Sequence, residues 1–289
     1  MRTETSGAIG DQDKTVTPQP NPSQNNMQRD QHESCNSVPF DHGQNLASLS
    51  GPRAALSVMF QCGSPASLLD VGCGIGQWVQ AARELGVKDA WGLDGVRIPS
   101  ASLHFPAENF LTQPLTKPFS LARRFDVALC LEVGEHLDSE HARTLIETLV
   151  AHADTIYFSG ACPGQPGQHH VNCQWPAYWQ QLFNEQGYAC SDRLRWMLWA
   201  DERIEPWYRQ NIFVAKREPT LAGKEARIPP VVHPALLPFL LQGEEIAKVE
   251  TGRMSLSWYG AILPKALWAK LQRRTAALTK QDSVDLTKS

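Results

Sequence analysis

Three glycines that alternate with other residues follow a short apolar run, and this pattern constrains the fold more than any other feature of the chain. The run covers residues 66–71, and the glycines are Gly72, Gly74 and Gly76. A buried strand that ends in glycines and leads into a helix is typical of a parallel α/β sheet. Because glycine has no Cβ, the backbone of such a loop can turn tightly and approach a ligand closely. We therefore expect a ligand-binding loop at the end of this strand.

The glycine spacing and two acidic residues favour one class of ligand. A dinucleotide-binding loop usually reads Gly-x-Gly-x-x-Gly, whereas this loop begins at Asp70 and reads Asp-x-Gly-x-Gly-x-Gly. Asp94 ends a second predicted strand, and its separation from the loop is close to the roughly 20 residues typical of an acid that binds ribose hydroxyls. The simpler alternative is that Asp94 caps a turn. We interpret the loop and Asp94 as an S-adenosylmethionine site, with a NAD-dependent Rossmann oxidoreductase as the alternative.

Predicted strands and helices alternate through the middle of the chain. The predicted order is strand 66–71, helix 76–85, strand 89–94, strand 125–133, helix 139–153, strand 154–159 and helix 175–186. Such alternation implies an α/β fold, in which a mostly parallel sheet is covered by helices on both faces. Two later runs, residues 193–198 and 210–215, are predicted to form a closing β-hairpin.

Three segments of different character make up the chain. Residues 1–45 are polar, hold almost no aliphatic side chains and are predicted to form a disordered tail. Residues 46–218 hold the alternating elements and form the predicted domain. Residues 219–289 begin with a proline-rich linker and continue as predicted helices. Within them, residues 255–279 carry apolar and basic side chains at helical spacing. We expect this helix to pack on the domain or on a second subunit, with a peripheral membrane contact as the alternative.

Charge and cysteine content argue against several classes of protein. The formal net charge is −3 over 289 residues, and no basic module is evident, so nucleic acid is not a favoured partner. The seven cysteines include no Cys-x-x-Cys pair, which argues against a disulfide framework and a thiolate zinc site. No apolar run approaches the roughly 20 residues that span a bilayer, and the polar N-terminus does not resemble a signal peptide. We therefore expect a cytoplasmic protein.

Carboxylates and histidines gather where two of the predicted strands end. The strand at residues 125–133 runs into Glu132, Glu135 and His136, and a glycine- and proline-rich loop after the next strand carries His169 and His170. The carboxyl ends of parallel strands lie at one edge of a sheet, where ligands bind in this class of fold. These side chains are therefore expected to converge near the chemistry.

Three interpretations of this cluster remain open. In the first, Glu135 and His136 cap a helix and the later histidines are ordinary loop residues. In the second, His136 or His170 is a metal-free general base for a hydroxyl, which suits an imidazole with an unperturbed pKa of about 6.5. In the third, Glu132, Glu135, His136 and one of the two loop histidines hold Mg²⁺, Mn²⁺ or Co²⁺, and the metal binds two neighbouring substrate hydroxyls and lowers the pKa of one.

The glycine loop, Asp94 and the strand at residues 125–133 together resemble class I S-adenosylmethionine-dependent methyltransferases. The resemblance covers about residues 60–217. It implies a Rossmann-like sheet of seven strands, the last one antiparallel, and it implies cofactor binding through Asp70, the three glycines and Asp94.

A second resemblance concerns the Glu-x-x-Glu-His pattern. Glu132, Glu135 and His136 match the metal site of plant-type small-RNA 2′-O-methyltransferases and of ubiquinone-pathway O-methyltransferases, and His170 is the best match for the later ligand. The resemblance implies a metal-assisted O-methyltransferase that acts on vicinal hydroxyls. Because Trp207 and Tyr208 could stack against a sugar, we expect a glycan or other polyhydroxylated small molecule as acceptor. A protein that binds S-adenosylmethionine without catalysis is a further alternative.

Overall fold

The computed structural model describes residues 48–237, 255–265 and 268. The tail predicted for residues 1–45 lies outside the described residues. Residues 256–265 are helical, as is residue 268, but the rest of the helix predicted for residues 255–279 lies outside them too. Its packing on the domain, on a second subunit or on a membrane stays a prediction. No helix in the described part of the chain combines the length and the apolar character that a membrane crossing requires.

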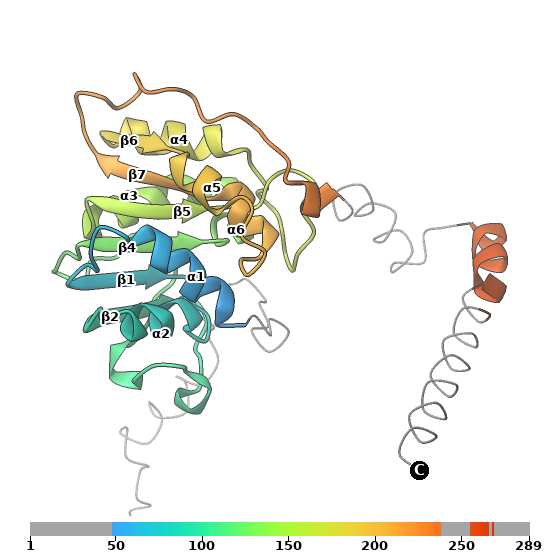
Figure 1. Cartoon of the computed structure of the whole chain (residues 1–289), viewed down its shortest axis with the longest axis horizontal. Coiled ribbons are helices and arrows are strands. Elements are labelled where there is room, and N and C mark those ends of the chain that lie inside the picture. Colours follow the sequence, from blue (N-terminus) through green and yellow to red (C-terminus); the bar gives the residue numbers. More distant parts are fainter. Residues whose placement is uncertain (1–47, 238–254, 266–267, 269–289) are drawn as a thin grey trace, which may run out of the picture. The chain divides into compact units, whose positions relative to one another are not determined.

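One mixed sheet of seven strands forms the centre of the domain (Figure 1). The strands are β1 (Ser67–Val71), β2 (Asp89–Asp94), β3 (Phe110–Thr112), β4 (Val127–Leu131), β5 (Thr155–Ser159), β6 (Tyr188–Ser191) and β7 (Phe213–Arg217), in the order β3-β2-β1-β4-β5-β7-β6. Strands β1 to β5 pair in parallel, whereas β7 runs antiparallel to both β5 and β6. This arrangement confirms the predicted Rossmann-like sheet. The strand order reverses between β1 and β4, and such a switch point opens a ligand crevice at the carboxyl ends of the strands.

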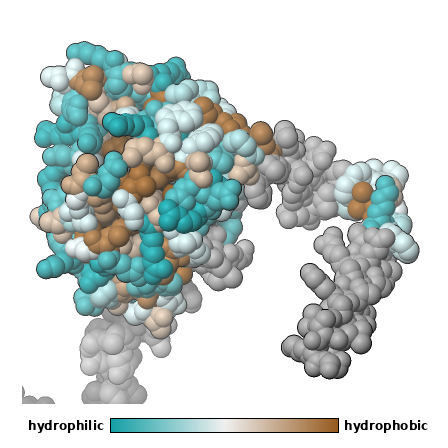
Figure 2. Space-filling model, viewed as in Figure 1, coloured by the Kyte–Doolittle hydropathy of each residue, from teal (hydrophilic) through white to brown (hydrophobic). Residues whose placement is uncertain are grey.

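Helices cover both faces of the sheet. The α-helices are α1 (Ser50–Met59), α2 (Gln77–Glu84), α3 (Ala142–His152), α4 (Pro176–Glu185), α5 (Arg193–Leu198) and α6 (Pro206–Asn211). Short 3₁₀ turns are η3 (Ser100–Ser102), η4 (Ala107–Asn109), η5 (Gly134–His136), η6 (Ser139–His141) and η7 (Pro234–Leu236). Helices α1, α2 and α5 lie on the face toward the viewer in Figure 1, and α3 and α4 cover the far face. The surface in Figure 2 is hydrophilic over most of the near face, with apolar side chains gathered near its middle.

Each face of the sheet has its own apolar core. On the α3–α4 side, Phe158 of β5 contacts the rings of Trp179 and Phe183 from α4 and of Phe213 from β7. On the other side, α1, α2 and α5 bury small and aliphatic side chains against the sheet. Both cores are built mostly from β-branched, leucine and aromatic residues in continuous runs, which is why the parallel strands could be recognised in the sequence.

The predicted closing hairpin is wrong in its strand positions. Residues 193–198, expected as a strand, form α5, and the antiparallel pair consists of β6 and β7, with α5 and α6 between them. An alternating pattern would bury Leu194, Trp196 and Leu198 together, but Trp196 is 49% exposed. Leu194 and Leu198 are buried because they are four residues apart on one face of a helix. The second run begins in α6, whose first residue, Pro206, is favoured at a helix start.

The glycine loop connects β1 to α2 in a conformation that side chains disfavour. Gly72, Gly74 and Gly76 all have positive φ angles, of 78°, 53° and 90°. A Cβ on Gly72 would lie 2.3 Å from a methyl carbon of Val133, at the end of β4. Alanine at this position would therefore meet both a backbone cost and a steric clash.

We expect Gly72→Ala to destabilise the domain more than Gly86→Ala. Gly86 also has a positive φ, of 97°, but no atom lies within 4 Å of a Cβ built there. Both variants carry a backbone cost of about 1–2 kcal/mol, and only Gly72→Ala adds an overpacking cost of about 1–3 kcal/mol. Urea unfolding of the two variants measures the difference, and equal losses would contradict the clash with Val133.

Candidate active site

A cavity of about 570 Å³ opens at the carboxyl ends of β1, β2 and β4. Its walls come from the glycine loop, the end of β2, the segment after β4, the loop at residues 165–170 and helix α6. This is the switch point of the sheet, and the volume is within the usual range for small-molecule sites. The cavity holds every residue that the sequence predicted for the site except Gly76, which is the N-cap of α2.

The cavity wall is acidic. Five carboxyl side chains line it, and no lysine or arginine is among the described residues of the wall. The five are Asp70, Asp94, Glu132, Glu135 and Glu205. Where they are deprotonated, the carboxyls of such a wall attract a cation and repel a ligand that carries phosphate groups. It therefore suits the sulfonium and ammonium charges of S-adenosylmethionine and not the pyrophosphate of a dinucleotide.

Asp94 ties the end of β2 to the glycine loop. Its carboxylate accepts hydrogen bonds from the backbone N–H of Gly74, at 2.9 Å, and of Val96, at 2.8 Å. Each carboxylate oxygen has two acceptor sites, so the side chain can also accept from ribose hydroxyls in the cavity. In this conformation Asp94 can therefore cap the turn and bind ribose at the same time.

Asp70 is buried at the cavity wall, with an exposed fraction of 2%. Its Oδ2 atom has no hydrogen-bond partner. Burial, and then the neighbouring charge of Asp94, raise the pKa of Asp70 to about 8. A buried carboxyl of this kind binds a proton or a cation, because the uncompensated charge is costly.

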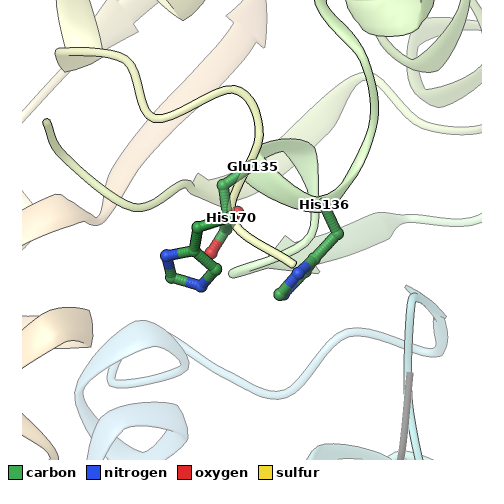
Figure 3. Close-up of side chains that lie close together, drawn as sticks. All are labelled: Glu135, His136 and His170. Carbon is green, nitrogen blue, oxygen red and sulfur yellow. The ribbon is translucent and has the colours of Figure 1, made fainter. Parts of the chain in front are cut away.

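Glu135, His136 and His170 form a compact group on the opposite wall. Each offers a ligand atom, and these atoms lie within 4.8 Å of one another. Figure 3 shows the two imidazoles side by side below the Glu135 carboxylate, with His136 coming from η5 and His170 from the neighbouring loop. The two rings meet edge to face, with centroids 5.0 Å apart. Two imidazole nitrogens and one carboxylate oxygen make a donor set for a divalent cation.

Backbone contacts hold this group together. Glu132 has a positive φ of 56°, and this turns the chain sharply from β4 into η5. The main-chain carbonyl of Glu135 then accepts hydrogen bonds from the N–H groups of Val171 and Asn172, at 2.9 and 3.0 Å. The loop that carries His170 is thereby attached directly to the turn that carries Glu135.

The structure distinguishes the two neighbouring histidines of the loop. His169 has a positive φ of 48° and is exposed, and it does not belong to the group. His170 is half-buried, and its Nδ1 lies 2.9 Å from the main-chain carbonyl of Gln165. A carbonyl only accepts, so Nδ1 carries the proton and Nε2 keeps its lone pair. A histidine oriented in this way is typical of metal ligands and of general bases.

Burial keeps both imidazoles of the group neutral. It is the main reason that the pKa of His136 is lowered to about 4, and the proximity of the second ionisable ring, His170, lowers it further. Burial also lowers the pKa of His170. At neutral pH each ring therefore has a lone pair available, which metal binding and proton abstraction both require.

The buried Glu135 and the half-buried Glu132 form a pair of interacting acids. Glu135 is fully buried, and neither of its carboxylate oxygens has a partner in ordinary hydrogen-bond geometry, although the backbone N–H of Ala161 and the Glu132 carboxyl lie close by. Burial and the adjacent Glu132 raise its pKa well above the ordinary value. Glu132 lies outside the three-residue group, and its carboxylate accepts hydrogen bonds from the side-chain amides of Gln165, at 2.7 Å, and Asn211, at 3.2 Å. Its role as a fourth metal ligand stays a prediction.

Several residues of the site were not identified from the sequence. Gln165 and Asn211 hold Glu132, and Glu205 brings a further carboxylate to the cavity from the start of α6. Polar residues in a loop and a short helix have no distinctive spacing, so no local pattern could have identified them. Trp207 and Tyr208 line the cavity, as the sequence suggested for an acceptor wall.

Residues 46–203, more than half of the chain, match the profile of a family described as a methyltransferase domain, Methyltransf_23. The chain belongs to this family. Together with the sheet order and the glycine loop, this makes it a class I S-adenosylmethionine-dependent methyltransferase. Comparison with curated proteins gives no match.

Solved methyltransferase structures resemble the domain distantly. Magnesium protoporphyrin IX methyltransferase (ChlM) from Synechocystis PCC 6803, with bound S-adenosylhomocysteine, is 20% identical, with a TM-score of 0.43 over 59% of this chain and 84% of that chain. The plantazolicin methyltransferase BpumL is 18% identical, with a TM-score of 0.41 over 59% and 83%. The methyltransferase domain of bacterial CtHen1-C is 15% identical, with a TM-score of 0.43 over 59% and 100%. At these scores the likeness adds nothing to the family assignment.

We expect the methyltransferase to bind S-adenosylmethionine more tightly as the pH rises from 6 to 8. Asp70, with a pKa of about 8, is mostly protonated below pH 8, so it must release a proton before its charge can stabilise the cationic ligand. The dissociation constant should fall by up to about tenfold per pH unit over this range. Calorimetric titration measures the affinity. Asp70→Asn should bind more weakly at pH 8 with little pH dependence, and a constant affinity of the unmodified protein would contradict this role.

Proposed function

We propose that this methyltransferase transfers the methyl group of S-adenosylmethionine to a hydroxyl of a sugar, a glycan or another polyhydroxylated small molecule, assisted by Mg²⁺ or Mn²⁺. The observation that carries the proposal is the group formed by Glu135, His136 and His170 on the wall of the cavity. The proposed cofactor site is the opposite wall, with Gly72 and Gly74 against the ligand and Asp94 at the ribose.

The donor set fits a divalent cation. Glu135 is fully buried and neither carboxylate oxygen has a partner in ordinary hydrogen-bond geometry, and a buried carboxylate charge is costly unless a proton or a cation compensates it. Its neighbours in the group are two neutral imidazoles. Oxygen and nitrogen donors without a thiolate suit Mg²⁺ or Mn²⁺. When bound there, the cation supplies Lewis-acid polarisation of two neighbouring acceptor hydroxyls and lowers the pKa of one.

The chain's own residues would position the acceptor between the two walls. Trp207 and Tyr208 offer aromatic faces on which a sugar ring can pack. The acidic wall disfavours an acceptor with phosphate groups, so a neutral small molecule or glycan fits better than a nucleic acid.

A metal-independent reaction is the second candidate. The neutral imidazoles of His136 and His170 support it, because either ring can accept the proton of the acceptor hydroxyl. In that case Glu135 stays protonated, as its raised pKa allows.

We expect a chelator to abolish methyl transfer, and added Mn²⁺ or Mg²⁺ to restore it. The assay follows S-adenosylhomocysteine formed with a panel of vicinal diols, including catechol and simple sugars, and with matched acceptors that carry a single hydroxyl. Turnover should favour the diols, because a cation can bind both hydroxyls. Full activity after chelation would reject the metal and leave the general-base reaction.

Replacement of the two adjacent loop histidines should give opposite results. His170→Ala removes a member of the group and should lower kcat by at least about 100-fold. His169→Ala changes an exposed side chain outside the group and should leave kcat within about twofold. Calorimetry with Mn²⁺ tests the ligand role separately, because only His170→Ala should weaken binding. Equal effects of the two substitutions on kcat would contradict the assignment of His170.

A further inference from the structure

A chain of buried amide groups connects the C-terminal part of the domain to the active site. Residues 219–237, here named the strap, leave β7 and pass along β6 and α4 before they reach η7 (Figure 1). Glu225 and Ile228 attach the strap to Gln180 of α4. Farther along, His233 attaches it to α6, and the amide chain begins at that point.

The hydrogen bonds of this chain have a defined direction. The backbone N–H of His233 donates to Oε1 of Gln210, at 2.7 Å. A backbone N–H can only donate, so Gln210 must turn its oxygen to the strap and its nitrogen the other way. That nitrogen donates to Oδ1 of Asn211, at 3.0 Å. The nitrogen of Asn211 therefore faces the active site.

The amide chain ends on two residues of the proposed catalytic machinery. Asn211 donates to Oε1 of Glu132, at 3.2 Å, and to Oε1 of Gln165, at 2.9 Å. Gln165 donates to the other oxygen of Glu132, at 2.7 Å, and its main-chain carbonyl accepts from Nδ1 of His170. Both oxygens of Glu132 thus receive an N–H, and Gln165 joins Glu132 to His170.

Burial makes this arrangement specific. The exposed fractions of Gln210 and Asn211 are 1%, that of Gln165 is 8% and that of His233 is 6%. Buried amides are costly when unpaired, and a chain of them has few satisfied alternatives. The side chain of His233 fixes the strap as well, because Nε2 lies 2.9 Å from the carbonyl of Trp199 and Nδ1 accepts from the N–H of Ala235.

We propose that Gln210 and Asn211 are positioning residues for methyl transfer. They orient the Glu132 carboxylate and, through Gln165, the His170 imidazole, and the strap supplies the N–H that sets the direction of the chain. This inference rests on the proposed function, because it assumes that Glu132 and His170 take part in the reaction. The positioning residues lie beyond residue 203, where the match to the methyltransferase family ends.

A second buried glutamine provides a matched control. Gln180 has an exposed fraction of 4% and, like Gln210, accepts a hydrogen bond from a backbone N–H of the strap, that of Ile228. Its amide nitrogen donates to Glu225 and to the carbonyl of Ala226, so its side chain bonds only to the strap. Gln180→Met removes three hydrogen bonds to the strap, whereas Gln210→Met removes one to the strap, one to Asn211 and one to Cys162. Each variant thus loses three hydrogen bonds, and only Gln210→Met interrupts the amide chain.

The two methionine variants should lose similar thermal stability but differ in catalysis. With the best acceptor of the diol panel, Gln210→Met should lower kcat by at least about tenfold relative to Gln180→Met. The KM for S-adenosylmethionine should stay within about twofold in both, because the cofactor wall is untouched. If Gln210→Met fails to fold, Gln210→Glu replaces it, since a carboxylate accepts from His233 but cannot donate to Asn211. Equal losses of kcat in the variant and its control would overturn the proposal.

Crystal structures of the same variants separate this proposal from the proposed function. The Gln210 variant should show Glu132 or Gln165 in a new rotamer and a longer distance from His170 Nδ1 to the Gln165 carbonyl, whereas Gln180→Met should keep both. This result would support the amide chain even if no acceptor in the panel were methylated. An unchanged Glu132 and His170 in the Gln210 variant would refute the proposal even if the unmodified protein were active.

Discussion

The close approach of the Glu132 and Glu135 carboxyl groups is the constraint on which the rest of the active site depends. Glu135 is buried and Glu132 is half-buried, and the charge of Glu132 makes ionisation of Glu135 more costly. The protein compensates Glu132 with N–H donors from the side chains of Gln165 and Asn211, while Glu135 faces two neutral imidazoles. The two acids therefore differ in their surroundings. Hydrogen bonds from the protein hold Glu132, whereas Glu135 faces the cavity beside the two imidazoles, where a ligand could bind.

The two walls of the cavity carry acidic groups with different expected roles. Asp70 and Asp94 lie at the ends of β1 and β2, where the cationic cofactor is expected, and the acid–imidazole group lies at the end of β4. In the function that we propose, the first wall stabilises the positively charged methyl donor, and the second assists deprotonation of the acceptor. The lack of lysine and arginine on the described wall is consistent with both tasks, since a fixed cation would oppose each.

Features that repeat along the sequence could be predicted, and features that depend on long-range polar contacts could not. The continuous apolar runs of β1, β4 and β5 and the alternating glycines identified the sheet and its ligand-binding edge. The sequence did not distinguish a strand from a helix at Leu194, Trp196 and Leu198. The helix forms because it packs Leu194 and Leu198 against the sheet. The choice between His169 and His170 depended on burial and on the hydrogen bond between His170 Nδ1 and the Gln165 carbonyl, neither of which two adjacent histidines reveal in a sequence. Gln210 and Asn211 carry no local pattern, because their partners are 23 and 79 residues away.

Helix α6 has a consequence for how the acceptor specificity of such an enzyme can change. Within six residues it carries both the aromatic faces of Trp207 and Tyr208 and the amides of Gln210 and Asn211. If α6 moved to admit a larger acceptor, the Asn211 amide would also move away from Glu132 and its hydrogen bond would be lost. In the function that we propose, substrate range and catalytic geometry are therefore linked through α6, and new acceptors would be accommodated more readily by exchanging side chains on α6 than by moving its backbone.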